Sequence, residues 1–267
     1  MSLTQGDELA TMRASAPLVH CITNYVAMNI AANVLLAAGA SPAMVHAEDE
    51  VAEFASLAKA LTINIGTLSS PWLAAMKLAA GSANASHKPW VLDPVAHHAT
   101  AFRRRAIGEL LELQPTIIRG NASEIITLSG GHSASRGVDS SDAVAAAEHA
   151  AVRVAEQRGA IVAVTGAVDF VTDGNCAIRL SGGSPLMPQV TALGCSLTCL
   201  VGAFAGNRPD DLLGATVTAL ACFKLAGDTA GRQASGPGSF SWRFLDALAS
   251  MKQSDLSEWM EASVVML

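Results

Sequence analysis

The stretch Gln189-Val190-Thr191-Ala192-Leu193-Gly194-Cys195-Ser196-Leu197-Thr198 is a turn of small and polar residues that leads directly into an apolar helix. A helix start carries about four unpaired backbone N–H groups and roughly half a positive charge. A turn of small residues leaves these groups accessible to a phosphate or another anion. The stretch is therefore a candidate anion hole, and Gly194 is a candidate catalytic residue within it.

Cys195 is predicted to lie in the first turn of this helix, where the helix dipole lowers the pKa of a thiol and favours the thiolate. A thiolate there is a candidate general base. The alternative is a buried structural cysteine, because free Cys is among the most buried residue types. The stretch by itself leaves both interpretations open.

The composition excludes several classes of protein. Hydrophobic residues make up 51% of the 267 residues and charged residues 15%, yet the apolar runs are broken well short of the ~20 residues that span a bilayer. The net charge of −6 offers no basic surface for nucleic acid. The short run Arg103-Arg104-Arg105 is interpreted as a solvated helix face. We expect neither a membrane nor a nucleic-acid partner.

The cysteines indicate a reducing compartment. There are five, an odd number, with no C-x-x-C pair, and the first residues have neither a basic nor an apolar targeting segment. We therefore expect a cytoplasmic protein. Cys195 and Cys199 share a helix face but lack partner ligands for zinc. The many Ala and Val residues suit helices packed on a sheet, and they also suit a subunit interface, so a homo-oligomer is expected.

Short apolar strands alternate with amphipathic helices along the first two thirds of the chain. Strands are predicted near residues 18–22, 41–45, 61–65, 91–95, 116–118 and 161–164, and a hairpin near 169–180 around Asp173-Gly174. Helices are predicted from Cys195 to the end. This order predicts an α/β fold with a mostly parallel central sheet and antiparallel edge strands. No repeat or linker divides the chain, so residues 1–267 are expected to form a single domain.

Polar residues lie at the carboxyl ends of three of the predicted parallel strands, at the sheet edge where α/β proteins bind ligands. They are Asp93, Arg119 with Glu124, and Thr165 with Gly166. Two carboxylates for Mg²⁺, an Arg for phosphate and a glycine-rich anion hole are the components of phosphoryl transfer. No G-x-x-x-x-G-K-[ST] sequence is present, so this is not a P-loop enzyme.

Each of these residues also has a structural interpretation. Asp93 precedes Pro94 and would set a turn, Glu124 would complete a capping box with Asn121, and Arg119 would pair with a carboxylate on the surface. Asn24 would likewise cap the helix that follows it. The shared placement of the residues at one edge of the sheet favours the functional interpretation.

Seven short motifs follow one another along residues 17–249. They are Pro17-Leu18-Val19-His20-Cys21-Ile22-Thr23-Asn24, Gly39-Ala40-Ser41-Pro42-Ala43-Met44, Asn64-Ile65-Gly66-Thr67-Leu68, Leu92-Asp93-Pro94-Val95, Ile118-Arg119-Gly120-Asn121-Ala122-Ser123-Glu124-Ile125, Val164-Thr165-Gly166 and Gly236-Pro237-Gly238-Ser239-Phe240. Together they resemble the hydroxyethylthiazole kinase family, and their joint occurrence is very specific.

This resemblance implies a ribokinase-like three-layer α/β/α fold and a homotrimer with active sites between subunits. It implies ATP- and Mg²⁺-dependent phosphorylation of the hydroxyl of 4-methyl-5-(2-hydroxyethyl)thiazole in thiamine salvage. By matching motif, Asn24, Met44, Gly66, Thr67 and Ala192 would bind the thiazole alcohol beside Cys195. Arg119 and Thr165 would hold ATP. Asp93 and Glu124 would hold Mg²⁺ through its waters.

The chain departs from the family pattern at three places. The anion-hole motif, usually Thr-Gly-x-Gly-Cys, has Ala192 as its second residue, and Ala resists the positive φ that Gly allows. Ala96-His97-His98 replaces a small Gly-Ala-Gly, and Ala167 replaces a Glu. Two alternatives to a thiazole kinase follow: a ribokinase-like kinase of another small heteroaromatic alcohol, or a non-catalytic sensor of a thiazole or a nucleotide.

Overall fold

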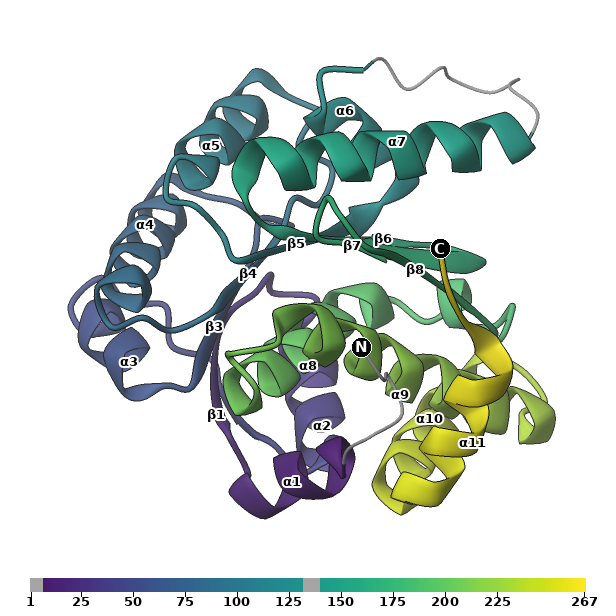
Figure 1. Ribbon diagram of the computed structural model, residues 1–267. Coiled ribbons are helices and arrows are strands. Elements are labelled where there is room, and N and C mark those ends of the chain that lie inside the picture. The colour runs from purple at the N-terminus through teal and green to yellow at the C-terminus, as the bar shows by residue number, and fades with distance from the viewer. Residues whose placement is uncertain (1–6, 132–139) are drawn as a thin grey trace.

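A nine-stranded mixed sheet runs through the middle of the molecule, with helices on both of its faces (Figure 1). The computed structural model describes residues 7–131 and 140–267. In spatial order the sheet is β2-β1-β3-β4-β5-β6-β7-β8-β9. The strands are β1 (Leu18–Ile22), β2 (Ser41–Ala43), β3 (Ala60–Asn64), β4 (Trp90–Asp93), β5 (Ile117–Asn121), β6 (Ile161–Thr165), β7 (Val168–Thr172), β8 (Ala177–Ser181) and β9 (Val264–Met266).

The first six strands are parallel and the last three are antiparallel to their neighbours. The predicted parallel sheet with an antiparallel hairpin at its edge is therefore confirmed. Helices dominate from Cys195 to the end, as predicted, but a short strand that the sequence did not reveal, β9, pairs with β8 at the end of the chain. Three residues are too few for a periodic pattern, so this strand depends on its tertiary partner.

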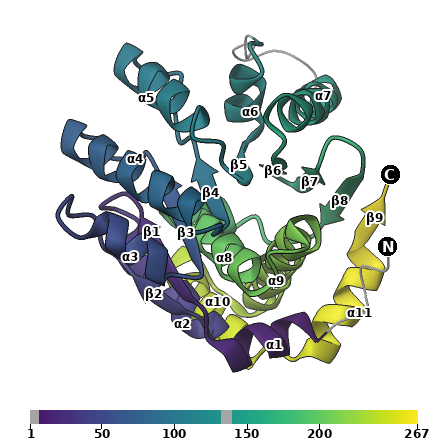
Figure 2. The same cartoon turned by 60° about the vertical axis from the view of Figure 1, so that its left-hand side comes forward.

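Two layers of helices cover the sheet. One layer holds α1 (Glu8–Ser15), α2 (Met28–Ala38), α8 (Leu193–Asn207), α9 (Leu212–Gln233), α10 (Pro237–Ser250) and α11 (Gln253–Ser263), with the 3₁₀ turn η1 (Met187–Gln189) beside α8. The other holds α3 (Val51–Leu57), α4 (Ser70–Ala85), α5 (Ala101–Leu111), α6 (Ala122–Leu128) and α7 (Ser140–Arg158), as the turned view in Figure 2 shows. The three-layer prediction is confirmed. Between α6 and α7 the sequence is rich in Gly and Ser from Ser129 to Ser141, which predicts a loop, and this segment lies largely outside the described residues.

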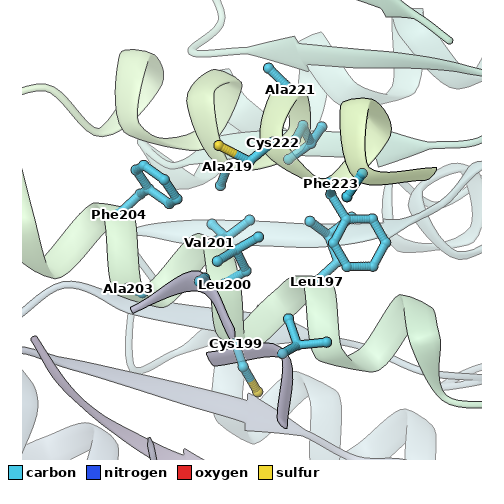
Figure 3. Packing of buried hydrophobic residues seen from close by; sticks show 14 of the residues in the cluster. Leu197, Cys199, Leu200, Val201, Ala203, Phe204, Ala219, Ala221, Cys222 and Phe223 are labelled. Atoms are coloured by element: carbon cyan, nitrogen blue, oxygen red, sulfur yellow. The ribbon is translucent and has the colours of Figure 1, made fainter. Parts of the chain in front are cut away.

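The strands supply side chains to a core on each face of the sheet. In β4, Val91 belongs to the core with α8 and α9, whereas Trp90 and Leu92 belong to the core with α4 and α5. This alternation is the period of two that a buried strand imposes. Figure 3 shows side chains of α8 and α9 packed against one another in the first of these cores.

Close packing of α8 on the sheet brings its first turns near the strand ends. At Gly202 an added Cβ would overlap the Thr62 methyl group of β3, so a larger residue there would push the helix away. α9 has the length and apolarity of a membrane span, but 78% of its apolar window is buried inside the fold. It is a core helix.

Candidate active site

The predicted site residues lie at the carboxyl edge of the parallel strands, as expected. The register pairs Asn64 at the end of β3 with Asp93 at the end of β4. It also pairs Asn121 at the end of β5 with Thr165 at the end of β6. The first turn of α8 lies over this edge, because α8 packs on β1, β3 and β4.

Asp93 is completely buried, and one of its two carboxylate oxygens is surrounded by donors. Oδ2 accepts hydrogen bonds from Asn64 Nδ2 at 2.8 Å and Thr198 Oγ1 at 2.7 Å, and it lies 3.5 Å from the Arg119 guanidinium. Oδ1 is buried without a hydrogen-bond partner. Burial raises the pKa of Asp93 to about 6, although Arg119 opposes the shift. The interpretation of Asp93 as a simple turn residue does not explain this environment.

Glu124 completes the capping box that the sequence predicts, and its carboxylate is also close enough to affect Asp93. Its Oε2 accepts the N–H of Asn121 at 2.8 Å while Asn121 caps the Glu124 N–H, so the predicted capping box is confirmed. Its Oε1 accepts the N–H of Ala96, in the loop after Asp93, at 3.0 Å. The Glu124 carboxylate thereby joins the loop after β4 to the start of α6, and its charge raises the pKa of Asp93.

Arg119 points into the site and is not a surface residue, because its side chain is only 11% exposed. Its Nη2 donates to Thr165 Oγ1 at 2.5 Å and its Nη1 lies near Asp93. A Cβ added to Gly194 would lie 3.3 Å from Nη2, so the first turn of α8 faces the guanidinium without a side chain between them. The Arg119 guanidinium and the N–H groups at the start of α8 therefore present donors to the same part of the site.

A second group of polar residues lies between Asp93 and the start of α8. Asn24 Nδ2 donates to Asn64 Oδ1 at 2.9 Å and lies 3.4 Å from Cys195 Sγ. Asn64 Oδ1 also accepts the Gly66 N–H at 2.9 Å, and Thr67 Oγ1 accepts a backbone N–H from the residue after Asn24 at 3.0 Å. These contacts bring together three of the residues predicted to bind the alcohol, Asn24, Gly66 and Thr67, and Cys195.

Two predictions about this group need correction. Asn24 does not cap α2, which begins at Met28; its Oδ1 accepts the Ala27 N–H and closes the turn before the helix. The expected lowering of the Cys195 pKa is wrong, because burial and the neighbouring Asp93 raise the pKa of this thiol to about 11. Burial and a nearby negative charge both disfavour a thiolate.

The remaining predicted residues lie around this centre. Ala192 is the residue before α8 and has φ +61°, so it occupies the left-handed conformation that Gly adopts more easily. Met44 follows β2, is half-buried, and packs against the core, farther along the sheet edge. His97 is buried with Nδ1 3.2 Å from Pro94 O, and burial lowers its pKa. A neutral buried ring is a poor phosphate ligand.

A cavity of about 610 Å³ opens beside Arg119, at the ends of β5, β6 and β8. Its walls include Thr165, Gly166 and Gly194 on one side and the glycines and Met187 that follow β8 on the other. A cavity of this size is typical of a small-molecule or nucleotide site. It meets the buried polar group around Asp93 at Arg119 and Gly194.

Sequence reasoning missed Arg103, which was interpreted as part of a solvated face. The side chain turns back from α5, and its guanidinium donates to Ile65 O at 2.7 Å, to Val95 O at 2.9 Å and to Gly66 O. It thus joins the loop after β3, which carries Gly66 and Thr67, to the loop after β4. Only the last two arginines of the run extend outward, so a charge run by itself cannot reveal this role.

We expect Arg103→Ala to lower kcat/KM for the acceptor alcohol by about 10²-fold, because small displacements of a substrate loop have effects of this size. Arg104→Ala is the matched control, since Arg104 is exposed and donates only to His98 O. Steady-state kinetics with each substrate varied checks this. Equal losses for the two variants would contradict the role of Arg103.

Asn64 and Thr198 were also missed as site residues. Asn64 carries the same signal as Asp93, a polar residue at the end of a buried strand. Thr198 lies three residues after Cys195 on an otherwise apolar helix, so both face the sheet edge. Both signals are present in the sequence but are weak without the sheet register.

The fold and this edge of polar groups define a class: small-molecule kinases of ribokinase-like architecture. The chain matches the sequence model described as "Hydroxyethylthiazole kinase family" over residues 9–254. It belongs to the hydroxyethylthiazole kinase family, and the resemblance found in the sequence is confirmed.

Members of this family are similar to the chain over almost its whole length. A hydroxyethylthiazole kinase of Rhizobium rhizogenes is 69% identical over 264 residues, which are 99% of this chain and 98% of the relative. The solved structure of a hydroxyethylthiazole kinase from Pyrococcus horikoshii superposes with a TM-score of 0.88 at 38% identity, covering 99% of this chain and 98% of the other. A ribokinase-like protein from Enterococcus faecalis, at 12% identity and a TM-score of 0.65 over 90% of this chain and 89% of its own, shares the fold alone.

Proposed function

We propose that this chain, as a single ribokinase-like domain in the cytoplasm, transfers the γ-phosphoryl group of ATP to the hydroxyl of 4-methyl-5-(2-hydroxyethyl)thiazole in thiamine salvage. Membership of the family supports the activity. The observation that carries the assignment to particular residues is the junction at Arg119 and Gly194, where the nucleotide-sized cavity meets the buried group around Asp93 and Cys195.

Arg119 and Thr165 would bind the phosphates of ATP. The Arg119 guanidinium supplies charge-assisted hydrogen bonds, and the Thr165 hydroxyl fixes its orientation through the 2.5 Å contact. The N–H groups at the start of α8, at Gly194, would receive the charge that develops on the transferred group. Positioning and charge neutralisation supply most of the catalysis in phosphoryl transfer.

The carboxylates fit an Mg²⁺ ion bound largely through water. Asp93 Oδ1 is buried without a partner and is free to accept from a metal-bound water. Both Glu124 oxygens accept one backbone N–H each and retain lone pairs for water. No group of three or more His, Cys, Asp and Glu side chains forms a metal cage in residues 7–131 and 140–267. Bound there with ATP, Mg²⁺ would neutralise charge on the phosphates, as in other kinases.

Asn24, Gly66, Thr67, Ala192 and Cys195 would surround the hydroxyl-bearing end of the thiazole. A carboxamide at Asn24 can hydrogen-bond the hydroxyl oxygen. With its pKa near 11, Cys195 is a thiol at neutral pH, so it contacts the hydroxyl as a protonated group. A loose transition state needs the alcohol proton removed late, which makes a strong base less important than the anion hole.

We expect Cys195→Ala to retain activity within about tenfold of the parent protein, whereas removal of a true general base reduces the rate about 10²–10⁴-fold. The rate should also show no thiol ionisation between pH 7 and 9 in the parent, because the Cys195 pKa of about 11 lies above this window. Rate profiles of both proteins test this. A 10³-fold loss in a folded variant would restore the general-base assignment.

The homotrimer with shared sites is supported by exposed apolar side chains beside the acceptor group. Tyr25 is 65% exposed and Val26 58% exposed, directly after Asn24, and the Tyr25 ring stacks on Trp72 with centroids 4.6 Å apart. Side chains of this kind are enriched at subunit interfaces. Met44, farther along the same sheet edge, would contribute across the interface. Light scattering combined with activity on dilution tests this, and an active monomer would contradict it.

A panel of acceptors tests the proposed substrate. The parent protein should turn over ATP with 4-methyl-5-(2-hydroxyethyl)thiazole and much more slowly with pyrimidine or pyridine alcohols of similar size. A higher kcat/KM for one of those would support the alternative of another heteroaromatic alcohol. Tight binding of the thiazole or ATP without turnover would support a sensor.

A further inference from the structure

Lys224 of α9 is almost completely buried against the nucleotide-sized cavity, with 4% of its surface exposed. Its Nζ donates to Gly166 O at 3.3 Å, to Ala167 O at 3.3 Å and to Gly182 O at 3.1 Å. It also lies 3.4 Å from the buried Asp169 carboxylate. Four oxygen atoms from two segments of the chain, residues 166–169 and Gly182, therefore converge on one ammonium group.

These contacts use all the hydrogen-bonding capacity of the lysine. An ammonium group has three N–H donors, and three backbone carbonyls lie within reach of them. No donor remains for a phosphate oxygen. A lysine in the wall of a nucleotide cavity would ordinarily be interpreted as a phosphate ligand, and the geometry here opposes that interpretation.

The segments joined by Lys224 are neighbours in the wall of the cavity, because β7 and β8 pair from Val168 opposite Ser181. Gly166 and Ala167 form the turn between β6 and β7, and Asp169 fixes this turn by accepting the Gly166 N–H at 2.9 Å. Gly182 follows β8. Without the ammonium group, these buried oxygens would lose their shared donor, which costs free energy and weakens the attachment of both segments to α9.

α9 holds the Gly182–Gly183 segment at two points. Lys224 binds the C=O of the peptide group between Gly182 and Gly183, and Asp228, one turn later, accepts the N–H of the same peptide at 2.8 Å. Trp259 donates to the other oxygen of Asp228 at 2.8 Å. Gly182 and Gly183 have no side chains, so the backbone itself forms this part of the wall. Both have positive φ, 121° and 90°, which favours glycine at these positions.

We propose that Lys224 is a positioning residue of the nucleotide site, a built-in cation that anchors the β6–β7 turn and the Gly182–Gly183 segment to α9 in the arrangement that ATP requires. This rests on the proposed function only in taking the cavity as the ATP site. The oxygen ligand set is one that an ammonium or potassium ion would also accept, if the side chain were removed.

The test measures nucleotide affinity in Lys224→Met, with Lys77→Met, an exposed lysine of α4 paired with Glu109, as the matched control. Dissociation constants for AMP, ADP and a non-hydrolysable ATP analogue are compared in the presence of Mg²⁺. We expect all three affinities to fall by a similar factor, about 10- to 100-fold, while KM for the alcohol changes little. Lys77→Met should bind all three like the parent.

A phosphate ligand would give a different pattern. If the loss rose from AMP through ADP to ATP, Lys224 would contact phosphate and the proposal would be overturned, as it would by unchanged affinities. In Lys224→Ala, ammonium chloride should restore part of the lost affinity and tetramethylammonium chloride should not. Equal effects of the two salts would also count against the proposal.

Removal of Lys224 leaves Asp169 buried without its partner, so Lys224→Met is accompanied by the double variant Lys224→Met/Asp169→Asn. Lys224→Arg keeps the buried charge, but its planar fork cannot meet three converging carbonyls, so it should show the same uniform loss. Parent-like nucleotide affinity in the folded double variant or in folded Lys224→Arg would overturn the proposal. Failure of the parent itself to bind any of the nucleotides would contradict the proposed function instead.

Discussion

Asp93→Asn is expected to lower kcat/KM for ATP by about 10³-fold, because the charge that would hold Mg²⁺ is lost from the centre of the site. The surroundings determine how the amide is oriented. Its oxygen would replace Oδ2, which accepts from Asn64 and Thr198, and its NH₂ would replace the unpartnered Oδ1. An N–H donor would then face the position proposed for the metal and its waters.

The same geometry predicts that Asp93→Asn stays folded. The amide has almost the volume of the carboxylate, keeps the hydrogen bonds from Asn64 and Thr198, and removes a charge from a fully buried position. Its thermal midpoint should equal or exceed that of the parent. Kinetics across a Mg²⁺ titration and a melting curve measure the two effects, with Asp210→Asn, at an exposed position before α9, as the control. Near-parental activity would remove Asp93 from the metal site.

Arg119→Met is expected to lower kcat/KM for ATP by about 10²–10³-fold, the loss typical of removing one fixed donor to a developing charge. The Met side chain fills the half-buried volume but donates no hydrogen bond. KM for the alcohol should change far less, because the group around Asn24 and Cys195 does not include Arg119.

Arg119→Lys separates charge from geometry. A lysine keeps the positive charge but cannot donate to Thr165 and face both Asp93 and Gly194 in the way that a planar guanidinium does. We expect it to recover no more than about a tenth of the parent kcat/KM. Separate variation of ATP and alcohol in both variants provides the measurement. Equal rises in the two KM values would mean that Arg119 supports the fold of the site and not ATP binding.

The placement of Asp93, Arg119 and Thr165 was predictable from the sequence because each lies at or near the carboxyl end of a short apolar strand. The rule that parallel strands end at one edge then brings them together without knowledge of any contact. The capping box of Glu124 was equally local, since it needs only a spacing of three residues. These features depend on nearest neighbours in the sequence.

The features that were missed depend on the tertiary structure. β9 exists only because β8 offers an edge, and Arg103 turns inward only because two loop ends present carbonyls to it. The Cys195 pKa was misjudged because the helix start is a local signal, whereas burial and the approach of Asp93 are not. Lys224 lies in a helix whose sequence predicts only a buried apolar face. In each case a distant segment decides the role of the side chain.

The most direct test of this account is the stoichiometry of the reaction followed by phosphorus NMR. Purified protein, ATP, Mg²⁺ and 4-methyl-5-(2-hydroxyethyl)thiazole should yield one thiazole phosphate monoester for each ADP, with little inorganic phosphate and little ADP when the alcohol is omitted. The same experiment with Arg119→Met should yield far less of both products. ATP left intact in the complete mixture, or ADP formed with inorganic phosphate and no monoester, would contradict phosphoryl transfer to the thiazole alcohol at this site.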